Sequence, residues 1–439
     1  MAAILLFIYN LLIILLIVPA SFLILIFSGK YRKELFYKLK ERFVCYKPFP
    51  KQSKKIIWIH CSSLGEVRAV EPILDALRQD FFIVLTTITK TGREYASKIQ
   101  KADFVSLLPL DLYFFMRKAF KIIKPDILIL VETELWASML YAANANNVKV
   151  MTINGRMSEK SFKIYKFLKF FWGFFARFIN IVLARSKDDA DRFAYLSGKN
   201  TEIHVTGNIK YDRDFVSKLV RADLDLKDGD IIFTAGSTRE GEEEIIAGAY
   251  NKINEKFPEI KFFLAPRHLS RIERVKRILS EKGVKFLLFS EMLHCHSKLV
   301  SEYVVKEQQP LKQVQGDKYN FILVDVFGQL QSIYSISDIC YVGGSIVKKG
   351  GQNPIEPAAY GKPVLFGIYM DNFKTEAEIL VKYGGAINVF DAGDIAEKVN
   401  KFLSNKKIIA ETGRNALKAV NSQKGAVNLT AQKIREYLK

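Results

Sequence analysis

From residue 55 onward, short apolar runs alternate with longer amphipathic stretches in which apolar residues recur at helical spacing. Apolar runs of about four to eight residues between helical stretches are typical of parallel strands, because the connecting helices then cover both faces of the sheet. The first series of strands is predicted at Lys55–His60, Phe82–Thr87, Asp103–Leu108, Asp126–Val131, Val148–Ile153, Ile179–Ala184 and Glu202–Val205.

The alternation lapses between Asn208 and Asp230 and then restarts, whereas the final stretch from Asp391 has a helical pattern only. A chain of 439 residues exceeds one ordinary core, so we predict two successive doubly wound α/β domains that face each other across a cleft. Ligands of such sheets bind beyond the carboxyl ends of the strands. The second series is predicted at Asp230–Ala235, Lys261–Ala265, Val284–Phe289, Phe321–Val324, Ile339–Val342, Pro363–Phe366 and Ala386–Val389.

The amino-terminal segment is apolar, with 24 uncharged residues from Ile4 to Phe27. At about 1.5 Å per helical residue this length crosses a hydrocarbon core of roughly 30 Å, and the absence of a basic start argues against a cleaved signal peptide. Asn10 and Pro19 keep open an insertion that does not span the bilayer. We predict a membrane anchor over residues 1–28, a first domain over 29–215 and a second over 216–439 that ends in closing helices.

The formal net charge of +20 implies an anionic partner. The stretch from Lys30 to Lys55 contains ten basic residues and two acidic ones, and it directly follows the apolar segment. This position favours a membrane surface over nucleic acid as the anionic partner. The same charges place the body of the chain on the cytoplasmic side of the membrane. The stretch Phe162–Phe178 interleaves lysines with aromatics, and it fits either a basic helix at a lipid interface or a core helix with a solvated lysine face.

Three carboxylates follow predicted strands of the first domain. Glu66 begins a helix after the first strand, where it fits either a general base or a first-turn residue that complements the helix dipole. Glu132 and Glu134 follow the fourth strand and would project together if that segment were extended. One of the two fits a substrate-orienting role and the other a helix cap, and the sequence does not assign them.

The second domain offers several anion-binding features. The turn Gly236–Glu242 is rich in donors, so its N–H groups and the following helix start are candidates for holding a phosphate. Arg267, after a strand that ends at Pro266, suits phosphate or carboxylate by its forked donors, with a surface salt bridge as the alternative. The glycine-rich run Gly343–Gly351 leads to Asn353, which is predicted to cap a helix.

That helix is predicted to begin at Pro354 and to carry Glu356 in its first turn. A nucleotide phosphate would then lie at the helix terminus, while Glu356 accepts hydrogen bonds from ribose hydroxyls. We interpret the glycines as positions at which the backbone comes close to this ligand, because packing alone does not explain a glycine-rich run followed by Asn-Pro.

These motifs, in this order, resemble the family of 3-deoxy-D-manno-oct-2-ulosonic acid (Kdo) transferases of lipopolysaccharide synthesis. The resemblance implies a GT-B fold, CMP-Kdo as donor, the lipid A precursor lipid IV-A as acceptor, and inversion at the anomeric carbon without metal or cofactor. It also implies a place on the cytoplasmic side of the bacterial inner membrane. The matching segments are Tyr31-Arg32, Glu41–Phe43, His60–Glu66, Glu132–Trp136, Gly207–Asp212, Gly236–Glu243, Pro266–His268, Gly343–Ser345, Gly350–Glu356 and Asn372–Lys374.

By the same resemblance, Glu66 matches the general base that deprotonates the acceptor hydroxyl, and Glu132 and Lys210 match positions that stabilise the transition state. Gln329 and Gln352 stand where the family commonly has Glu and His, and both keep hydrogen-bonding ability, so altered donor affinity is expected rather than lost activity. The CMP-binding surface corresponds to Pro266, Arg267, Phe327, Gly328, Gln329, Asn353, Pro354, Ile355 and Glu356.

Two other functions remain open on the sequence. Rossmann-like domains do not fix the sugar, so another membrane-associated GT-B enzyme that uses a UDP- or GDP-sugar fits the same fold. A membrane-tethered, non-catalytic protein that binds polyanions fits the charge, although the chain has no known nucleic-acid motif.

Overall fold

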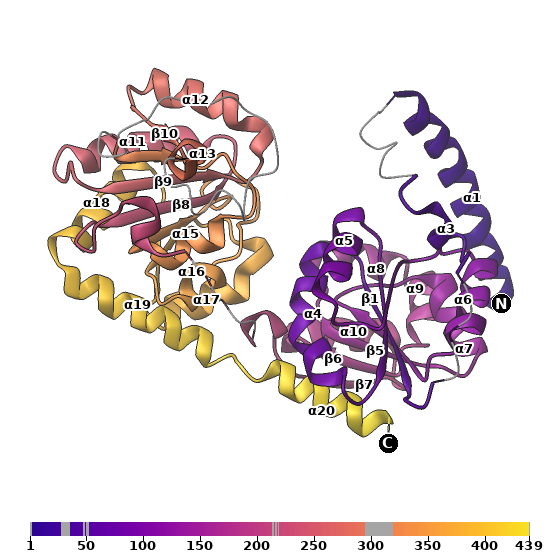
Figure 1. Ribbon diagram of the computed structural model, residues 1–439. Helices are drawn as coiled ribbons and strands as arrows, with labels where there is room; N and C mark the ends of the chain where they lie inside the picture. The colour runs from indigo at the N-terminus through magenta and orange to yellow at the C-terminus, as the bar shows by residue number, and fades with distance from the viewer. Residues whose placement is uncertain are drawn as a thin grey trace. The chain divides into compact units, whose positions relative to one another are not determined.

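The computed structural model describes residues 2–27, 36–46, 49, 52–212, 215, 217, 219–294 and 319–438 (Figure 1). The chain divides into two compact units. Unit 1 comprises Met1–Arg213 and Gln423–Lys439, and unit 2 comprises Asp214–Ser422. Each unit is built around one parallel sheet of seven strands.

The sheet of unit 1 has the strand order β3-β2-β1-β4-β5-β6-β7. The strand order reverses between β1 and β4, which are neighbours. The crevice beside such a reversal is where doubly wound sheets bind their ligands. The strands are β1 (Ile56–Cys61), β2 (Phe82–Thr87), β3 (Phe104–Leu107), β4 (Ile127–Val131), β5 (Lys149–Gly155), β6 (Ile181–Ala184) and β7 (Glu202–Val205).

Both faces of this sheet are buried. In β1, Ile57 and Ile59 join the apolar cluster on one face and Trp58 joins the cluster on the other. A strand covered on both faces needs apolar residues at every position, which explains the continuous apolar runs of the sequence. The helices of unit 1 are α1 (Ala2–Phe27), α3 (Leu39–Arg42), α4 (Leu64–Leu77), α5 (Lys90–Ile99), α6 (Tyr113–Ile123), α7 (Ala137–Ala145), α8 (Glu159–Phe167), α9 (Lys169–Ala176), α10 (Lys187–Ser197), the 3₁₀ turn η1 (Ile209–Asp212) and α20 (Ala426–Leu438).

The sheet of unit 2 has the order β10-β11-β9-β8-β12-β13-β14, and it reverses between β8 and β12. Its strands are β8 (Ile232–Thr238), β9 (Lys261–Pro266), β10 (Leu287–Leu288), β11 (Phe321–Leu323), β12 (Ile339–Val342), β13 (Val364–Phe366) and β14 (Ala386–Asn388). Its helices are η2 (Arg221–Leu224), α11 (Glu242–Asn254), η3 (Leu269–Arg271), α12 (Ile272–Glu281), α13 (Phe289–His294), α15 (Leu330–Ile336), α16 (Ile355–Ala359), η5 (Asp371–Phe373), α17 (Lys374–Lys382), α18 (Ala392–Ser404) and α19 (Lys406–Asn421).

The last helix belongs to unit 1, although the sequence assigned everything after residue 215 to the second domain. Asp212 accepts hydrogen bonds from the backbone N–H groups of Gly425 and Val427, both at 2.6 Å. These bonds fix the start of α20, whose apolar face, including Ile434, joins a core cluster of unit 1. The prediction that the carboxyl-terminal helices all close the second domain is therefore wrong for α20.

The amino-terminal helix α1 is fastened to unit 1 by polar contacts. The Tyr9 hydroxyl donates to Asp111 at 2.7 Å, and the Asn10 side-chain oxygen accepts from the N–H of Tyr113 at 2.8 Å. In the part of the chain that the structure describes, no helix is found that is both long and apolar enough to cross a membrane. The predicted anchor over residues 1–28 is not confirmed, and the basic residues at 28–35 lie outside the described residues.

The aromatic stretch Phe162–Phe178 forms two helices, α8 and α9, which meet at Leu168. Phe174 and Phe175 are buried in the core, whereas Phe167 and Phe170 are 89% and 72% exposed. The carboxyl-terminal aromatics are therefore core residues, as the core-helix interpretation expects, while contact of the exposed central ones with lipid stays a prediction.

Candidate active site

Glu66 lies in the first turn of α4, directly beyond the carboxyl end of β1. Its carboxylate accepts from the N–H of Ser62 at 2.6 Å, from the Ser63 hydroxyl at 3.1 Å and from the Ser62 hydroxyl. Ser63 is the helix N-cap. Glu66 thus lies in the first turn, as the helix-dipole alternative requires, and also beyond the carboxyl end of β1, where a general base was expected.

The environment of Glu66 disfavours its charged form. Burial raises the pKa of Glu66, the hydrogen bonds from Ser62 oppose this, and the negative charge of Glu132 raises it further. The net pKa lies above the ordinary value for glutamate. A base with a raised pKa takes up a proton more readily, and this is the property that general base catalysis near neutral pH requires.

Glu132 follows β4 in the left-handed conformation, with φ at 62°. This conformation costs roughly 1–2 kcal/mol for a residue with a Cβ. Its carboxylate forms an ion pair with Lys210 at 2.7 Å. Burial opposes ionisation, but the charge and hydrogen bond of Lys210, with smaller contributions from Arg156 and Arg185, hold the pKa of Glu132 below its ordinary value.

Glu134 has different partners from Glu132, and the extended backbone in which the two would project together does not form, because Glu132 is left-handed. Its carboxylate accepts from the indole N–H of Trp136 at 2.5 Å and lies 4.0 Å from Nε2 of His60. Burial, followed by the negative charge of Glu66, raises the pKa of Glu134 to about 7. The left-handed turn at Glu132 is the physical reason for the divergence, because side chains two positions apart share a direction only in extended backbone.

Lys210 is carried by η1, which is held from two sides. The side-chain oxygen of Asn154 accepts from the N–H of Ile209 at 3.2 Å, and Asp212 binds the start of α20. The structure therefore brings together three residues predicted from the sequence, Glu66, Glu132 and Lys210, within unit 1.

The donor residues predicted in unit 2 lie at one edge of its sheet. β11, β9, β8 and β12 are neighbours in that order. Pro266 is the last residue of β9, and Arg267 follows it. Phe327 and Gly328 form the turn after β11, where the Phe327 ring is 70% exposed and Gly328 has a φ of 88°. Gln329, which is buried, precedes α15.

Arg267 is exposed, and its side chain makes no ion pair or hydrogen bond with any other described residue. Its backbone N–H donates to the carbonyl of Thr238 at 3.0 Å, which fixes the residue between β8 and β9. Nearby, Arg239 contacts Nε2 of His268 at 2.7 Å, and burial together with the charge of Arg267 lowers the pKa of Arg239. The alternative of a surface salt bridge for Arg267 is wrong within the described residues.

The loops after β8 and β12 are joined by a carboxylate at the start of α11. Glu242 is fully buried and accepts from the N–H groups of Gly344 at 2.6 Å and of Arg239 and Ser345, both at 2.9 Å. Of these three N–H groups only that of Arg239 belongs to the turn Gly236–Glu242, so Glu242 takes one of its donors, and phosphate binding by the rest of the turn stays a prediction. Glu242 ties the loops after β8 and β12 together.

The glycine-rich run is explained by close packing within unit 2. Gly350 and Gly351 have φ values of 80° and 74°, and a Cβ at either position would collide with Asn372 or Met370, respectively. The interpretation that the glycines serve the approach of a ligand is therefore not needed at these two positions.

The Asn-Pro cap forms with a shift of one residue. α16 begins at Ile355 instead of Pro354, which is its N-cap. The side-chain oxygen of Asn353 accepts from the N–H of Ile355 at 3.1 Å, as a cap should, and its amide lies 3.4 Å from the Glu356 carboxylate. The two polar side chains assigned to the nucleotide are thus held next to each other.

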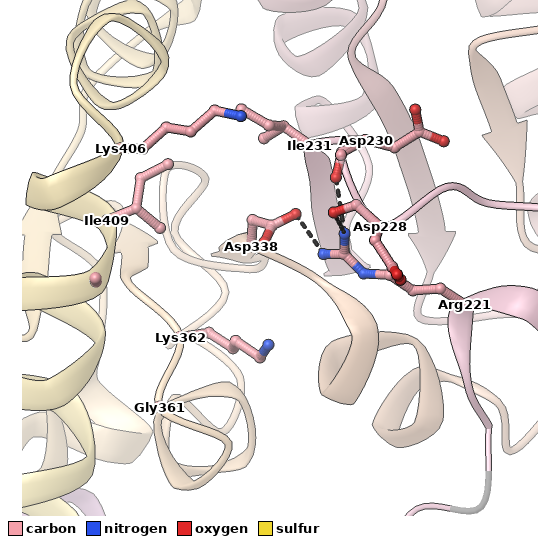
Figure 2. A pocket seen from close by; sticks show the side chains of 11 residues that line it. Arg221, Asp228, Asp230, Ile231, Asp338, Gly361, Lys362, Lys406 and Ile409 are labelled. Atoms are coloured by element: carbon pink, nitrogen blue, oxygen red, sulfur yellow. Dashed lines mark hydrogen bonds and ion pairs between the residues drawn. The ribbon is translucent and has the colours of Figure 1, made fainter.

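A pocket of about 340 Å³ opens elsewhere in unit 2, and Figure 2 shows it. It lies at the amino ends of β8, β12 and β13, opposite the edge that carries the donor residues. Arg221 forms an ion pair with Asp338 at 2.7 Å and donates to backbone oxygens of Asp228 and Asp230 (Figure 2). Arg221 is therefore occupied in joining η2 to the sheet, and no predicted site residue lines this pocket.

Four further residues contribute to the two regions although the sequence did not single them out for a role. Three of them, Ser62, His60 and Arg239, lie inside the motifs His60–Glu66 and Gly236–Glu243. The sequence therefore indicated that they lie at or near strand ends, but it did not indicate their contacts. Glu242 reads as one of three acidic residues in the first turn of a helix. Within the described residues, no group of three or more His, Cys, Asp or Glu side chains is placed to hold a metal ion.

Comparisons with known proteins bear on these two regions. The family described as 3-Deoxy-D-manno-octulosonic-acid transferase (kdotransferase) matches residues 37–213. A 3-deoxy-D-manno-octulosonic acid transferase from Haemophilus influenzae is 30% identical over 420 residues, which cover 94% of this chain and 93% of the relative. One from Aquifex aeolicus is 28% identical over 399 residues, covering 89% of this chain and 97% of that protein.

Solved structures share the fold at lower identity. A glycosyltransferase from Rickettsia africae has a TM-score of 0.59 at 17% identity and matches 88% of this chain and 98% of its own. A UDP-GlcNAc 2-epimerase from Neisseria meningitidis has a TM-score of 0.59 at 15% identity, over 87% and 100% of the two chains. With the two parallel sheets, these likenesses confirm the predicted GT-B class of two doubly wound domains.

Proposed function

Because the chain belongs to the 3-deoxy-D-manno-octulosonic acid transferase family, we propose that it transfers Kdo from CMP-Kdo to lipid IV-A in lipopolysaccharide synthesis. The observation that carries this proposal is the cluster in unit 1, where Glu66 with a raised pKa lies beside the Glu132–Lys210 ion pair. The cluster supplies a base and a cation, and unit 2 supplies unpaired arginine charge for an anionic donor.

On the acceptor side, Glu66 is the general base. The acceptor hydroxyl loses its proton to Glu66 as its oxygen attacks the anomeric carbon, and the bond from that carbon to the phosphate oxygen of CMP breaks. A single displacement inverts the anomeric carbon. Lys210, held by Glu132 at 2.7 Å, provides positive charge close to the reacting groups. The proposal includes no metal, because Lys210, Arg156 and Arg185 already place cationic charge around Glu132.

On the donor side, Arg267 and Arg239 attract the phosphate and carboxylate of CMP-Kdo. Arg267 has no partner among the described residues, and a forked guanidinium binds both kinds of anion in a bidentate way. Asn353 and Glu356, held 3.4 Å apart, are placed for the hydroxyls of the ribose. The backbone around these side chains is shaped by Pro266, Gly328 and Ile355. The exposed Phe327 ring offers a surface on which the cytosine ring of CMP can stack.

The identity of the donor is tested by the nucleotide that the enzyme releases. Full-length protein is incubated with lipid IV-A and with CMP-Kdo, a UDP-sugar or a GDP-sugar in separate reactions. We expect CMP release that depends on the lipid, and no UDP or GDP release. Release of UDP or GDP instead would assign the chain to another GT-B activity, and no release at all would favour a binding protein.

We also propose that unit 1 carries the protein on the cytoplasmic face of the inner membrane. Phe7, Leu16, Phe167 and Phe170 expose between 67% and 89% of their surface. The ring of Tyr9 in α1 contacts those of Phe171, Trp172 and Phe175 in α9, with centroids 5.9–6.5 Å apart, so α1 and α9 pack against each other. Lysines between the aromatics favour anionic lipid.

Vesicle binding tests the membrane proposal. Replacing both Phe167 and Phe170 with serine removes apolar surface worth about 1.5–3 kcal/mol per side chain if it enters the bilayer. We expect at least a tenfold weaker partition onto vesicles that contain anionic phospholipid. Phe390→Ser is the matched control, because Phe390 is 61% exposed but lies in unit 2. Equal partition of the double variant and the control would remove α8 and α9 from the membrane surface.

A further inference from the structure

The pocket in Figure 2 is a cavity that the proposed transfer does not use. Its walls include Ile231, Asp338 and Lys362, which come before β8, β12 and β13, and residues at the start of α19. Because the strands of this sheet run parallel, the residues assigned to CMP, which follow strands, lie at the opposite edge. The volume of about 340 Å³ falls within the range of small-molecule pockets, about 300–1,000 Å³. The space therefore suits a small organic molecule better than a single ion.

Lys362 lines this pocket as a cation without a partner. The residue is half-buried, and its ammonium group makes no hydrogen bond or ion pair with any other described residue. Burial lowers the pKa of Lys362, and this outweighs the opposing influence of Cys340 and Asp338. An ammonium group that is partly withdrawn from water without an acceptor is unfavourable. An anion in the pocket would supply that acceptor.

Arg221 also lines the pocket, but its five N–H donors are all used within unit 2. They bond to the backbone oxygens of Ile336 and of the loop before β8, and to Oδ2 of Asp338 at 2.7 Å. The same Asp338 oxygen accepts from the N–H of Ile232 at 2.8 Å. Oδ1 of Asp338, in contrast, has no hydrogen-bond donor among the described residues. It is left as an acceptor for a hydroxyl group.

The remaining charges around the pocket do not neutralise its lysines. Lys406, in the first turn of α19, is exposed and has no ion pair with any described residue, and the helix dipole adds positive potential there. Asp230 accepts from the N–H of Lys227 at 2.9 Å, and Figure 2 shows its carboxylate directed away from the two pocket lysines. Asp228 is exposed, so water and salt screen its charge. Lys362 and Lys406 are therefore the cations with which a ligand can pair.

We propose that this pocket binds a sugar phosphate. The phosphate pairs with Lys362 and Lys406, because ammonium groups bind phosphate as point charges. A sugar hydroxyl donates to Oδ1 of Asp338, and Ile231 and Ile409 supply apolar surface for the carbon atoms of the sugar. A bare phosphate ion would leave both this acceptor and part of the volume unused. The site is separate from the transfer site, and the inference does not rest on the proposed function.

Calorimetry with ribose 5-phosphate tests the binding. The full-length protein carries Arg267→Ala throughout, so that the donor arginine at the opposite edge does not contribute. We expect saturable binding that becomes at least about tenfold weaker on adding Lys362→Met or Lys406→Met, since each removes a charge-assisted hydrogen bond. Lys407→Met is the matched control, because Lys407 is the next residue of α19 but does not line the pocket. No saturable binding, or equal affinity of all these variants, would overturn the proposal. Lys406 is exposed, so its variant keeps the test valid should Lys362→Met not fold.

A labelling experiment locates the bound probe. The full-length protein is acylated briefly with and without ribose 5-phosphate, and the modified lysines are identified by mass spectrometry. At about ten times its dissociation constant, the probe should slow acylation of Lys362 about tenfold and leave that of Lys407 unchanged. Ribose and inorganic phosphate at the same concentration should protect Lys362 less. Unprotected Lys362 would overturn the site, and equal protection by ribose or by inorganic phosphate would overturn the pairing with the group that this control lacks.

Discussion

Replacing Glu66 with glutamine tests the base without disturbing the helix start. Glutamine is nearly isosteric, and its side-chain oxygen still accepts from the Ser62 N–H, while its amide group faces the serine hydroxyls as a donor. The cap of α4 by Ser63 does not depend on the Glu66 side chain, because Ser63 accepts from a backbone N–H. The fold is therefore retained, and the proton acceptor is lost.

The expected effect follows from the role of the base. General base catalysis contributes about 100-fold to 10,000-fold in rate, so kcat should fall by at least about 100-fold, which corresponds to about 2.7 kcal/mol of activation free energy. Binding of CMP-Kdo should stay nearly unchanged, since the donor residues lie in unit 2 and Glu66 in unit 1.

The assay combines kcat for Kdo transfer with calorimetric binding of CMP-Kdo. Glu71→Gln is the matched control, because Glu71 lies on α4 but pairs with Lys101 and Tyr95 outside the cluster. The control should retain wild-type turnover. Near-normal turnover of Glu66→Gln would remove Glu66 from the role of base, and a parallel loss of donor binding would indicate damage to the fold.

Two further substitutions address the donor arginine and the ion pair. Arg267→Ala should weaken CMP-Kdo binding about tenfold or more, since a charge-assisted hydrogen bond is worth about 1.5–3 kcal/mol. The control Arg274→Ala, which removes an exposed arginine of α12, should leave the affinity unchanged. Equal affinities of the two variants in calorimetry would count against the assigned site. Lys210→Met should leave the Glu132 charge unpaired, which lowers kcat by about 100-fold and the free energy of unfolding by about 1–3 kcal/mol. Adding Glu132→Gln should restore the stability measured by chemical denaturation, but not kcat. An unchanged stability of the single variant would show that the ion pair is solvated.

The strands of both sheets were predictable because each is buried on two faces. Trp58 and its neighbours in β1 read as a continuous apolar run for this reason. The edge strand β10 was the exception, predicted over Val284–Phe289 but formed only by Leu287–Leu288. It pairs with β11 alone, and Phe289 already begins α13, so the local apolar pattern overestimated the strand.

The features that escaped prediction depend on contacts between distant parts of the chain. Asp212 holds the start of α20 more than two hundred residues later, which no local pattern reveals. Glu242 reads as an ordinary acidic residue at a helix start, yet it binds N–H groups of the loops after β8 and β12. Glu132 takes a left-handed turn that propensity would assign to glycine or asparagine. The candidate residues were visible because they follow strands, but their partners required the fold.

The central claim is that the cluster around Glu66 transfers an acidic sugar to a lipid. The most direct measurement is to incubate the full-length protein with CMP-Kdo and lipid IV-A and to weigh the lipid products by mass spectrometry. The account predicts lipid that is heavier by one or more whole Kdo units, with CMP released in equal amount, and no such product from Glu66→Gln over the same time. Lipid of unchanged mass with the wild-type protein, or equal product from both proteins, would contradict it.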